Sequence, residues 1–302
     1  MDKTGELTSK QIVTIIILIV SFTVILLFFF TLNLKSEINS ETCRNSVILR
    51  GTALGDSTRL NCKTEDICFS KTKDCDVDLK DMVVIKVENK QEFLDEASDL
   101  VYNCYWQMGE GKVNYAPKNF GGDKNYCAIC DRIYFDKSLK EEGIINVSNT
   151  EWYYFLKGKR TPNGDNNLLF EIYKINSIDS VFSQLKASNK ELENLDVGKL
   201  DIFTGGKNFV VVTSLTESGW GSALFGVGTG AVIGVIAVVA APFTAGASLV
   251  IGGAAIGAVI GGTAGLVISG PGGDGQFLPP TYYPNEPKVL KDLNCYEFST
   301  LS

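Results

Sequence analysis

The residues of this chain best suited to chemistry are two cysteines in the sequence Cys127-Ala128-Ile129-Cys130. A CxxC pair can cycle between thiols and a disulfide, and the same spacing occurs in zinc sites. A thioredoxin-like site lies between a strand and a helix, whereas residues 131–136 (DRIYFD) have the pattern of a strand. A structural zinc site needs a second CxxC or a histidine pair, which the sequence lacks. We therefore predict structural disulfides here, with zinc binding and redox catalysis as the alternatives.

The chain has eight cysteines, and all of them lie outside its two long uncharged stretches, residues 11–34 and 219–273. An even count confined to the polar segments is typical of disulfides formed in an oxidising compartment. We predict that all eight form disulfides: Cys43, Cys62, Cys68, Cys75, Cys104, Cys127, Cys130 and Cys295.

Histidine is absent, which excludes Ser-His-Asp and Cys-His catalysis and HExxH metal sites. The adjacent or nearby carboxylates Asp95/Glu96, Glu141/Glu142 and Glu191/Glu193 lie in polar segments, and we interpret them as surface residues. The net charge of −7 argues against a nucleic-acid partner, which would need a basic face. We predict no catalytic residue, no metal site and no cofactor, and hence a protein that is not an enzyme.

Residues 11–34 form an uncharged segment bounded by Lys10 and Lys35 and made almost wholly of Ile, Val, Leu and Phe. At about 1.5 Å per helical residue, this length matches a hydrocarbon core of roughly 30 Å, so we expect a transmembrane anchor. A cleaved signal peptide and a type IV pilin leader are the alternatives, but no A-x-A-like site and no early glutamate are present. The cysteines place residues 1–10 in the cytoplasm and the bulk of the chain outside it, in the cell membrane, in agreement with a glycosylation sequon at Asn146.

Residues 36–219 alternate short apolar runs with helical patterns and predict a disulfide-stapled α+β domain. A helix should follow Asn89, which has capping-box spacing to Glu92. Its buried face should contain Phe93, Ala97, Leu100, Val101, Cys104 and Met108. Shorter helices are expected over residues 151–157 and 178–187, and strands over residues 82–87, 132–135, 168–175 and 209–214.

Aromatic residues, glycines and three cysteines are concentrated between Tyr102 and Tyr134. One interpretation is an aromatic binding surface on a stapled loop. The other, which we favour, is that the aromatic rings pack over disulfides and enlarge a small core.

Residues 220–270 contain glycines spaced four apart, a glycine-zipper pattern that places each set on one helical face. The glycines concerned are Gly226, Gly230, Gly234, Gly253, Gly257, Gly261 and Gly265. We predict an apolar helical hairpin with legs over residues 222–241 and 247–269, broken at Pro242. The hairpin could be a stable membrane element, could insert late into a bilayer, or could be buried in protein.

Residues 271–302 are rich in Pro and Gly and predict an extended tail that is tied back to the outer domain through Cys295. Since seven cysteines precede the hairpin and one follows it, full pairing requires the chain to return to the side that it left. The predicted fold class is therefore an α+β extracytoplasmic domain with an N-terminal transmembrane helix and a C-terminal glycine-zipper helical hairpin.

Four segments of the first half of the chain carry a resemblance to a known group of proteins. They are GELTSKQIVTIIILIVSFTVILLFFFTLNL at the start, CRNSV after it, and the later YNCYWQMGEGK and CAIC. Over about the first half of the chain, they resemble uncharacterised membrane-anchored, cysteine-containing proteins of small-genome archaea of the DPANN type. The resemblance implies an anchored, extracytoplasmic protein and implies no activity and no site residues.

The leading functional hypothesis is a membrane-anchored cell-envelope protein whose outward-facing domain contacts other surface components. Its glycine-zipper hairpin would serve helix packing or self-association, so the expected partners are a lipid bilayer and further copies or other membrane proteins. The alternatives are a membrane-inserting pore-forming or fusion-like effector and a thiol-disulfide oxidoreductase that uses Cys127 and Cys130.

Overall fold

The fold is that of a computed structural model of the 302-residue chain. It describes residues 9–31, 34–52, 59–77, 79–117, 125–174, 177–179, 196–199, 201–203, 207–217, 267–270, 273–287 and 295–298. The chain divides into two compact units, Met1–Glu41 and Thr42–Ser302.

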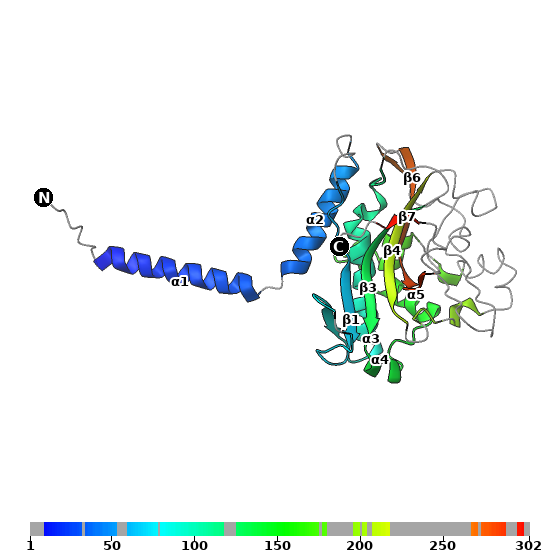
Figure 1. Cartoon of the computed structure of the whole chain (residues 1–302), viewed down its shortest axis with the longest axis horizontal. Helices are drawn as coiled ribbons and strands as arrows, with labels where there is room; N and C mark the ends of the chain where they lie inside the picture. Colours follow the sequence, from blue (N-terminus) through cyan, green and yellow to red (C-terminus); the bar gives the residue numbers. More distant parts are fainter. Residues whose placement is uncertain are drawn as a thin grey trace. The chain divides into compact units, whose positions relative to one another are not determined.

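The described helices and strands follow one another in an α+β order, with helices and strands interspersed (Figure 1). The helices are α1 (Ser9–Thr31), α2 (Leu34–Arg50), α3 (Lys90–Gln107), α4 (Lys137–Glu141), α5 (Asn149–Gly158) and α6 (Leu168–Tyr173), with 3-10 turns η2 (Gly109–Gly111) and η4 (Val197–Lys199). The strands are β1 (Glu65–Ser70), β2 (Val83–Lys86), β3 (Asn125–Phe135), β4 (Phe209–Glu217), β5 (Val267–Gly270), β6 (Gly273–Pro284) and β7 (Cys295–Phe298).

The strands of the second unit form one mixed seven-stranded sheet in the order β2-β1-β3-β4-β6-β5, with β7 also paired to β3. The β1–β2, β1–β3 and β3–β7 pairs are parallel, whereas β3–β4, β4–β6 and β5–β6 are antiparallel. β3 is therefore a central strand of the sheet, since it pairs with β1, β4 and β7 (Figure 1). The predicted strands at 82–87, 132–135 and 209–214 are confirmed as β2, part of β3 and part of β4.

Helix α3 begins where the sequence predicted, because the side chain of Asn89 accepts a hydrogen bond from the Glu92 backbone N–H. The reciprocal bond differs from that of a standard capping box, since Glu92 accepts from the backbone N–H of Glu88 at 2.7 Å. The predicted inner face is confirmed, with Leu100 partly buried and the other five residues buried. The first four N–H groups of a helix have no partner within it, and the Asn89 side chain satisfies one of them here.

Helices α3, α5 and α6 cover one face of the sheet and share one large core with it. Aromatic rings dominate its centre, where Phe203 meets five other rings at centroid distances between 4.8 and 6.3 Å. The opposite face of the sheet carries a smaller buried cluster of Cys127, Ile129, Val210 and Val212. Alternate residues of β3 and β4 therefore serve two different clusters, as the pleat requires.

The predicted strand over residues 168–175 is wrong, because Leu168–Tyr173 forms helix α6. Asn167 caps this helix by accepting a hydrogen bond from the Phe170 N–H at 2.9 Å. A short apolar run such as LLFEIY fits a buried strand and a buried helix equally well. The asparagine cap and the packing of α6 against α5 and β6 decide between them.

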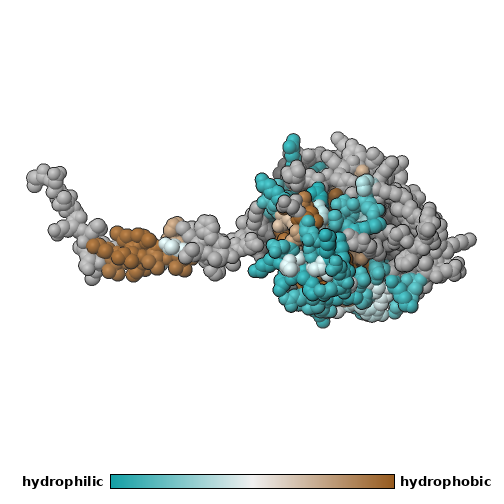
Figure 2. All heavy atoms as spheres, turned by 60° about the horizontal axis from the view of Figure 1, so that its bottom comes forward, coloured by the Kyte–Doolittle hydropathy of each residue, from teal (hydrophilic) through white to brown (hydrophobic). Residues whose placement is uncertain are grey.

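The first unit contains α1, where the side chains of residues 12–25 are exposed and, apart from Thr14, Ser21 and Thr23, apolar (Figure 2). The predicted transmembrane anchor over 11–34 is corrected. Within the part of the chain that the structure describes, no helix is both long and apolar enough to cross a membrane.

The C-terminal helical hairpin is also corrected where the structure describes it. The end of its second leg, Val267 to Ser269, belongs to strand β5, and the predicted extended tail contains strand β6, which pairs with β4 over most of its length. The β-branched Val267 and Ile268 favour a strand, and the ladders satisfy the backbone groups that a helix would have paired internally. Residues 220–266, with the seven zipper glycines, lie outside the described residues.

Candidate functional site

The two cysteines of the CAIC sequence lie within strand β3 and bond to different partners. Cys127 forms a disulfide with Cys295 of β7, and Cys130 forms one with Cys104 of α3. Both are buried, with 1% and 5% of their surface exposed. No disulfide joins the two residues of the CxxC sequence.

The pleat of β3 explains why these two cysteines do not pair with each other. Residues three apart on a strand point to opposite faces, whereas on a helix they share one face. Cys127 accordingly lies with the small cluster on one face, and Cys130 lies in the large core under α3. A β-bulge between Ile129 and Asp131 then keeps Asp131 on the same face as Cys130, opposite Val211.

All eight cysteines form disulfides, so the prediction of a disulfide framework is confirmed. Cys43–Cys62 joins α2 to the segment before β1, and Cys68–Cys75 joins β1 to the loop after it. The other two bonds both hold β3, one to α3 and one to β7. Among the described residues, no cluster of three or more potential metal ligands is present.

Of the three carboxylate pairs that the sequence singled out, the two that the structure describes each contribute one residue to a separate ion pair. Asp95 forms an ion pair with Lys159 at 2.8 Å, and Glu142 forms one with Lys71 at 2.7 Å, both at the surface. Glu96 beside Asp95 has a raised pKa, because burial penalises its charge and Asp99 repels it. Glu191 and Glu193 lie outside the described residues.

One carboxyl group that was not predicted as a site residue, Asp131, is 6% exposed within the core under α3. Burial raises its pKa well above the usual value, and repulsion from Glu65, its neighbour on β1, adds to the shift. No ion pair reaches Asp131 among the described side chains, so no neighbouring positive charge offsets this rise in its pKa. The signal in the sequence was a charged residue in the middle of the apolar run CAICDRIYF.

The aromatic segment between Tyr102 and Tyr134 serves packing where it is described. Tyr105, Tyr115 and Tyr126 are fully buried, and the Tyr115 and Tyr126 rings are 6.0 Å apart. Burial raises the pKa of Tyr105 and Tyr115 far above the usual value, so both remain protonated. The interpretation that these aromatic rings enlarge the core is the one that the structure supports.

The predicted glycosylation residue Asn146 is exposed, in the loop between α4 and α5. Two residues further on, Ser148 caps α5, and Glu151 completes the capping box by accepting from the backbone N–H of Ser148. The sequon therefore overlaps a helix cap, so its serine hydroxyl is already engaged in the folded chain.

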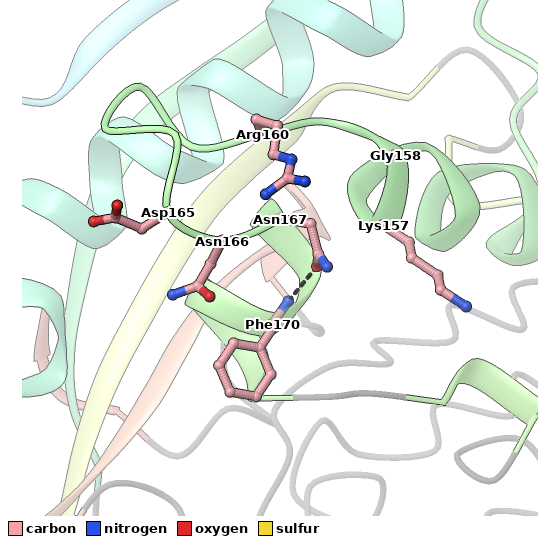
Figure 3. Close-up of a pocket in the computed structure, with 7 residues that line it drawn as sticks. All are labelled: Lys157, Gly158, Arg160, Asp165, Asn166, Asn167 and Phe170. Carbon is pink, nitrogen blue, oxygen red and sulfur yellow. Dashed lines mark hydrogen bonds between the residues drawn. The ribbon is translucent and has the colours of Figure 1, made fainter.

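A polar pocket of about 420 Å³ lies between the end of α5 and the start of α6 (Figure 3). Its lining residues are Lys157, Gly158, Arg160, Asp165, Asn166, Asn167 and Phe170. This pocket was not predicted from the sequence, because the residues after 167 were expected to form a strand. The turn-forming sequence Thr161-Pro162-Asn163-Gly164 was the available signal.

The pocket is shaped by a short loop whose backbone closes on itself. The N–H of Thr161 donates to the Asn166 carbonyl at 2.9 Å, and the N–H of Leu168 donates to the Lys159 carbonyl at 2.9 Å. Between them, Gly164 has φ of 76°, a left-handed conformation that favours glycine. These bonds hold Arg160 opposite Asn167, in an isolated antiparallel bridge.

The charges in the pocket are only weakly satisfied within the protein. Arg160 Nη1 donates to the Gly164 carbonyl at a long 3.4 Å, and neither Arg160 nor Lys157 has a carboxylate within ion-pair distance among the described side chains. Figure 3 shows the guanidinium of Arg160 pointing toward Asn167, and the carboxylate of Asp165 pointing away from it. The pocket therefore presents unused donors.

Comparison with known proteins identifies no relative. No protein-family model matches the chain, and no curated protein matches its sequence. No solved structure matches its fold. The function of the chain is therefore inferred from its own residues.

Proposed function

We propose that this chain is a non-enzymatic cell-envelope protein whose disulfide-stapled α+β domain works outside the cytoplasm, where it contacts other surface components. The observation that carries this proposal is the pairing of all eight cysteines, including Cys127 with Cys295 across 168 residues of sequence. Stable disulfides persist in oxidising compartments, whereas cytosolic thiols are kept reduced.

The burial of these bonds supports a structural role for them. Cys43, Cys68, Cys104 and Cys127 are each at most 1% exposed, so a soluble reductant has no direct access to their sulfur atoms. A redox-active pair needs an accessible thiolate. The oxidoreductase alternative, which required Cys127 and Cys130 to cycle with each other, therefore gains no support.

The apolar surface of α1 supports a role in contact with other components. Large apolar side chains on all sides of residues 12–25 are 45–63% exposed, and contiguous surfaces of this kind mark interaction sites. A lipid bilayer and further copies of the chain are the partners that we propose for this surface. The proposal requires apolar contact along α1 and does not require a helix that crosses the membrane.

Self-association through the glycine-rich segment remains a proposal from the sequence alone. Substitution of Gly257 and Gly261 by leucine would fill the shared face of such a helix and should abolish crosslinked oligomers in cells. Crosslinking that yields only monomers for the unaltered chain would remove self-association from the proposal. No structural observation favours the effector alternative, because the described end of its hairpin belongs to strand β5 and residues 220–266 lie outside the described residues.

Thiol trapping in intact cells tests the proposed compartment. Cells that express the chain are quenched with acid, and free thiols are alkylated under denaturing conditions with a reagent that adds mass. We expect no added mass unless the sample is first reduced, in which case eight additions should appear. A chain that carries several alkylated cysteines without reduction would contradict an oxidising location.

A further inference from the structure

The pocket between α5 and α6 combines cationic groups with a donor and an acceptor that the protein leaves unused. The side-chain oxygen of Asn167 accepts from the Phe170 N–H at 2.9 Å, which fixes the amide and leaves its NH₂ group as a donor. The NH₂ group of Asn166 donates to Glu171 at 3.1 Å, which leaves its carbonyl oxygen as an acceptor. Arg160 and Lys157 add positive charge (Figure 3).

We propose that this pocket binds the carboxylate-bearing sugar of an acidic saccharide. This inference rests on the proposed function, since it names the chemistry of one surface component that the domain contacts. Arg160 would hold the carboxylate, Lys157 would add a second positive charge at the rim, and the two asparagines would bind ring hydroxyl groups.

Among the groups that line the pocket, the guanidinium of Arg160 is the best suited to bind a carboxylate. Its donors form a planar fork that matches the two oxygens of a carboxylate. The one hydrogen bond that its guanidinium makes to the described residues is the long bond to the Gly164 carbonyl, so most of its five N–H donors have no partner among those residues. The Asp165 carboxylate, which could have neutralised it, points away.

The remaining lining residues favour a sugar over another carboxylate ligand. A hydroxyl group both donates and accepts, so it can bond to the Asn166 carbonyl oxygen and to the Asn167 NH₂ group. The half-buried Phe170 also lines the pocket and adds an apolar surface for the C–H face of a sugar ring. Gly158 has nothing within 4 Å of the position of an added Cβ, so the entrance beside it is open.

The size of the pocket agrees with this ligand, whereas the net charge of the whole chain opposes it. A volume of about 420 Å³ lies within the range of about 300–1,000 Å³ that small-ligand sites occupy. The chain carries a net charge of −7, so a free anion is repelled on average and must be attracted locally. Binding should therefore weaken as salt is added.

Calorimetric titration of the oxidised full-length chain tests the proposal with three matched probes. The probes are a trimer of galacturonic acid, the neutral trimer of galactose, and triglutamate, which carries carboxylates without sugar hydroxyls. We expect the acidic trisaccharide to bind at least tenfold more tightly than either of the other two. Equal binding of triglutamate would overturn the saccharide assignment, and no binding of the acidic trimer would overturn the site.

Surface substitutions then locate the binding to this pocket. Arg160→Gln should weaken binding of the acidic trimer at least tenfold. Arg160→Lys should also weaken it, because the planar fork of donors is lost. Lys157→Gln should weaken it about threefold. Lys137→Gln, an equal charge change on an exposed α4 residue outside the pocket, should leave binding unchanged. Equal losses in the Lys137 and Arg160 variants would show a general charge effect and overturn the proposal.

The outcome of this titration is separable from that of the thiol-trapping experiment. Titration uses purified, oxidised protein and reports only on the pocket, whereas thiol trapping reports only on the compartment. Thermal unfolding of each variant confirms that the exposed Arg160 and Lys157 were replaced without loss of the fold.

Discussion

Removal of the Cys127–Cys295 bond should be the most damaging single disulfide loss in this chain. The bond joins β3 to β7 and closes a loop of 168 residues in sequence separation, against 7 for Cys68–Cys75. We therefore compare the double variant Cys127→Ala/Cys295→Ala with the matched double variant Cys68→Ala/Cys75→Ala. Alanine avoids burying a new hydroxyl group at Cys127 or Cys68, which are 1% and 0% exposed.

The expected magnitudes follow from the entropy of the unfolded chain. In the loop-closure description, the long bond contributes about 5 kcal/mol at 25 °C and the short one about 2.5 kcal/mol. A domain has a total stability of only about 5–15 kcal/mol, so loss of the long bond removes a large share of it. β7 should respond first, because it pairs with β3 over only a few residues and loses its one covalent tie.

Two measurements check this prediction. Urea unfolding should give a loss about 2 kcal/mol or more larger for the Cys127/Cys295 variant than for the Cys68/Cys75 variant. Hydrogen exchange should show loss of protection at β7, while α3 and β4 stay protected. A Cys127/Cys295 variant that is as stable as the Cys68/Cys75 variant, with β7 still protected, would refute the loop-closure reasoning.

Three further substitutions probe the core, a buried carboxyl group and a helix cap, and two control substitutions accompany them. Asp131→Asn should raise the free energy of unfolding at neutral pH, because the folded chain holds Asp131 with a raised pKa while the unfolded chain ionises it near pH 4. The advantage over the unaltered chain should shrink as the pH falls toward 4, and an advantage constant with pH would contradict the raised pKa. Ser148→Ala should cost about 1 kcal/mol by removing the α5 cap. Asn146→Gln, which removes the same sequon without touching the cap, should cost less than about 0.5 kcal/mol in urea unfolding. Phe203→Ala should lower the free energy of unfolding by about 3–5 kcal/mol, because it leaves a cavity among the core rings. Truncation of the exposed Tyr154 should lower it by less than about 0.5 kcal/mol. Similar losses for both variants would contradict the assigned core.

The sequence predicted correctly those helices and strands whose conformation is determined by their own and neighbouring residues. The Asn89 cap and the apolar spacing after it predicted both the start of α3 and its buried face, because these depend on neighbours within one or two turns. The β-branched runs predicted β2 and β4 for the same reason. The even cysteine count predicted that disulfides form.

Elements that depend on distant partners were missed or misassigned. Residues 273–284 have the Pro and Gly content of a linker, yet they form β6 because β4 offers a complementary edge. The run at 168–173 became a helix because of Asn167 and its packing against α5. The pocket beside it could not be predicted, since it exists only when the loop places Arg160 opposite Asn167.

The sequence alone determined that this chain lacks histidine chemistry, carries cysteines suited to disulfides and contains an α+β domain. It could not determine which cysteines bond, because eight cysteines allow 105 pairings. Tertiary structure decided the partners of Cys127 and Cys130 by placing both on one strand, where residues three apart face opposite sides of the sheet. The spacing of two cysteines along the sequence does not determine whether they can bond, because their distance depends on the backbone conformation between them.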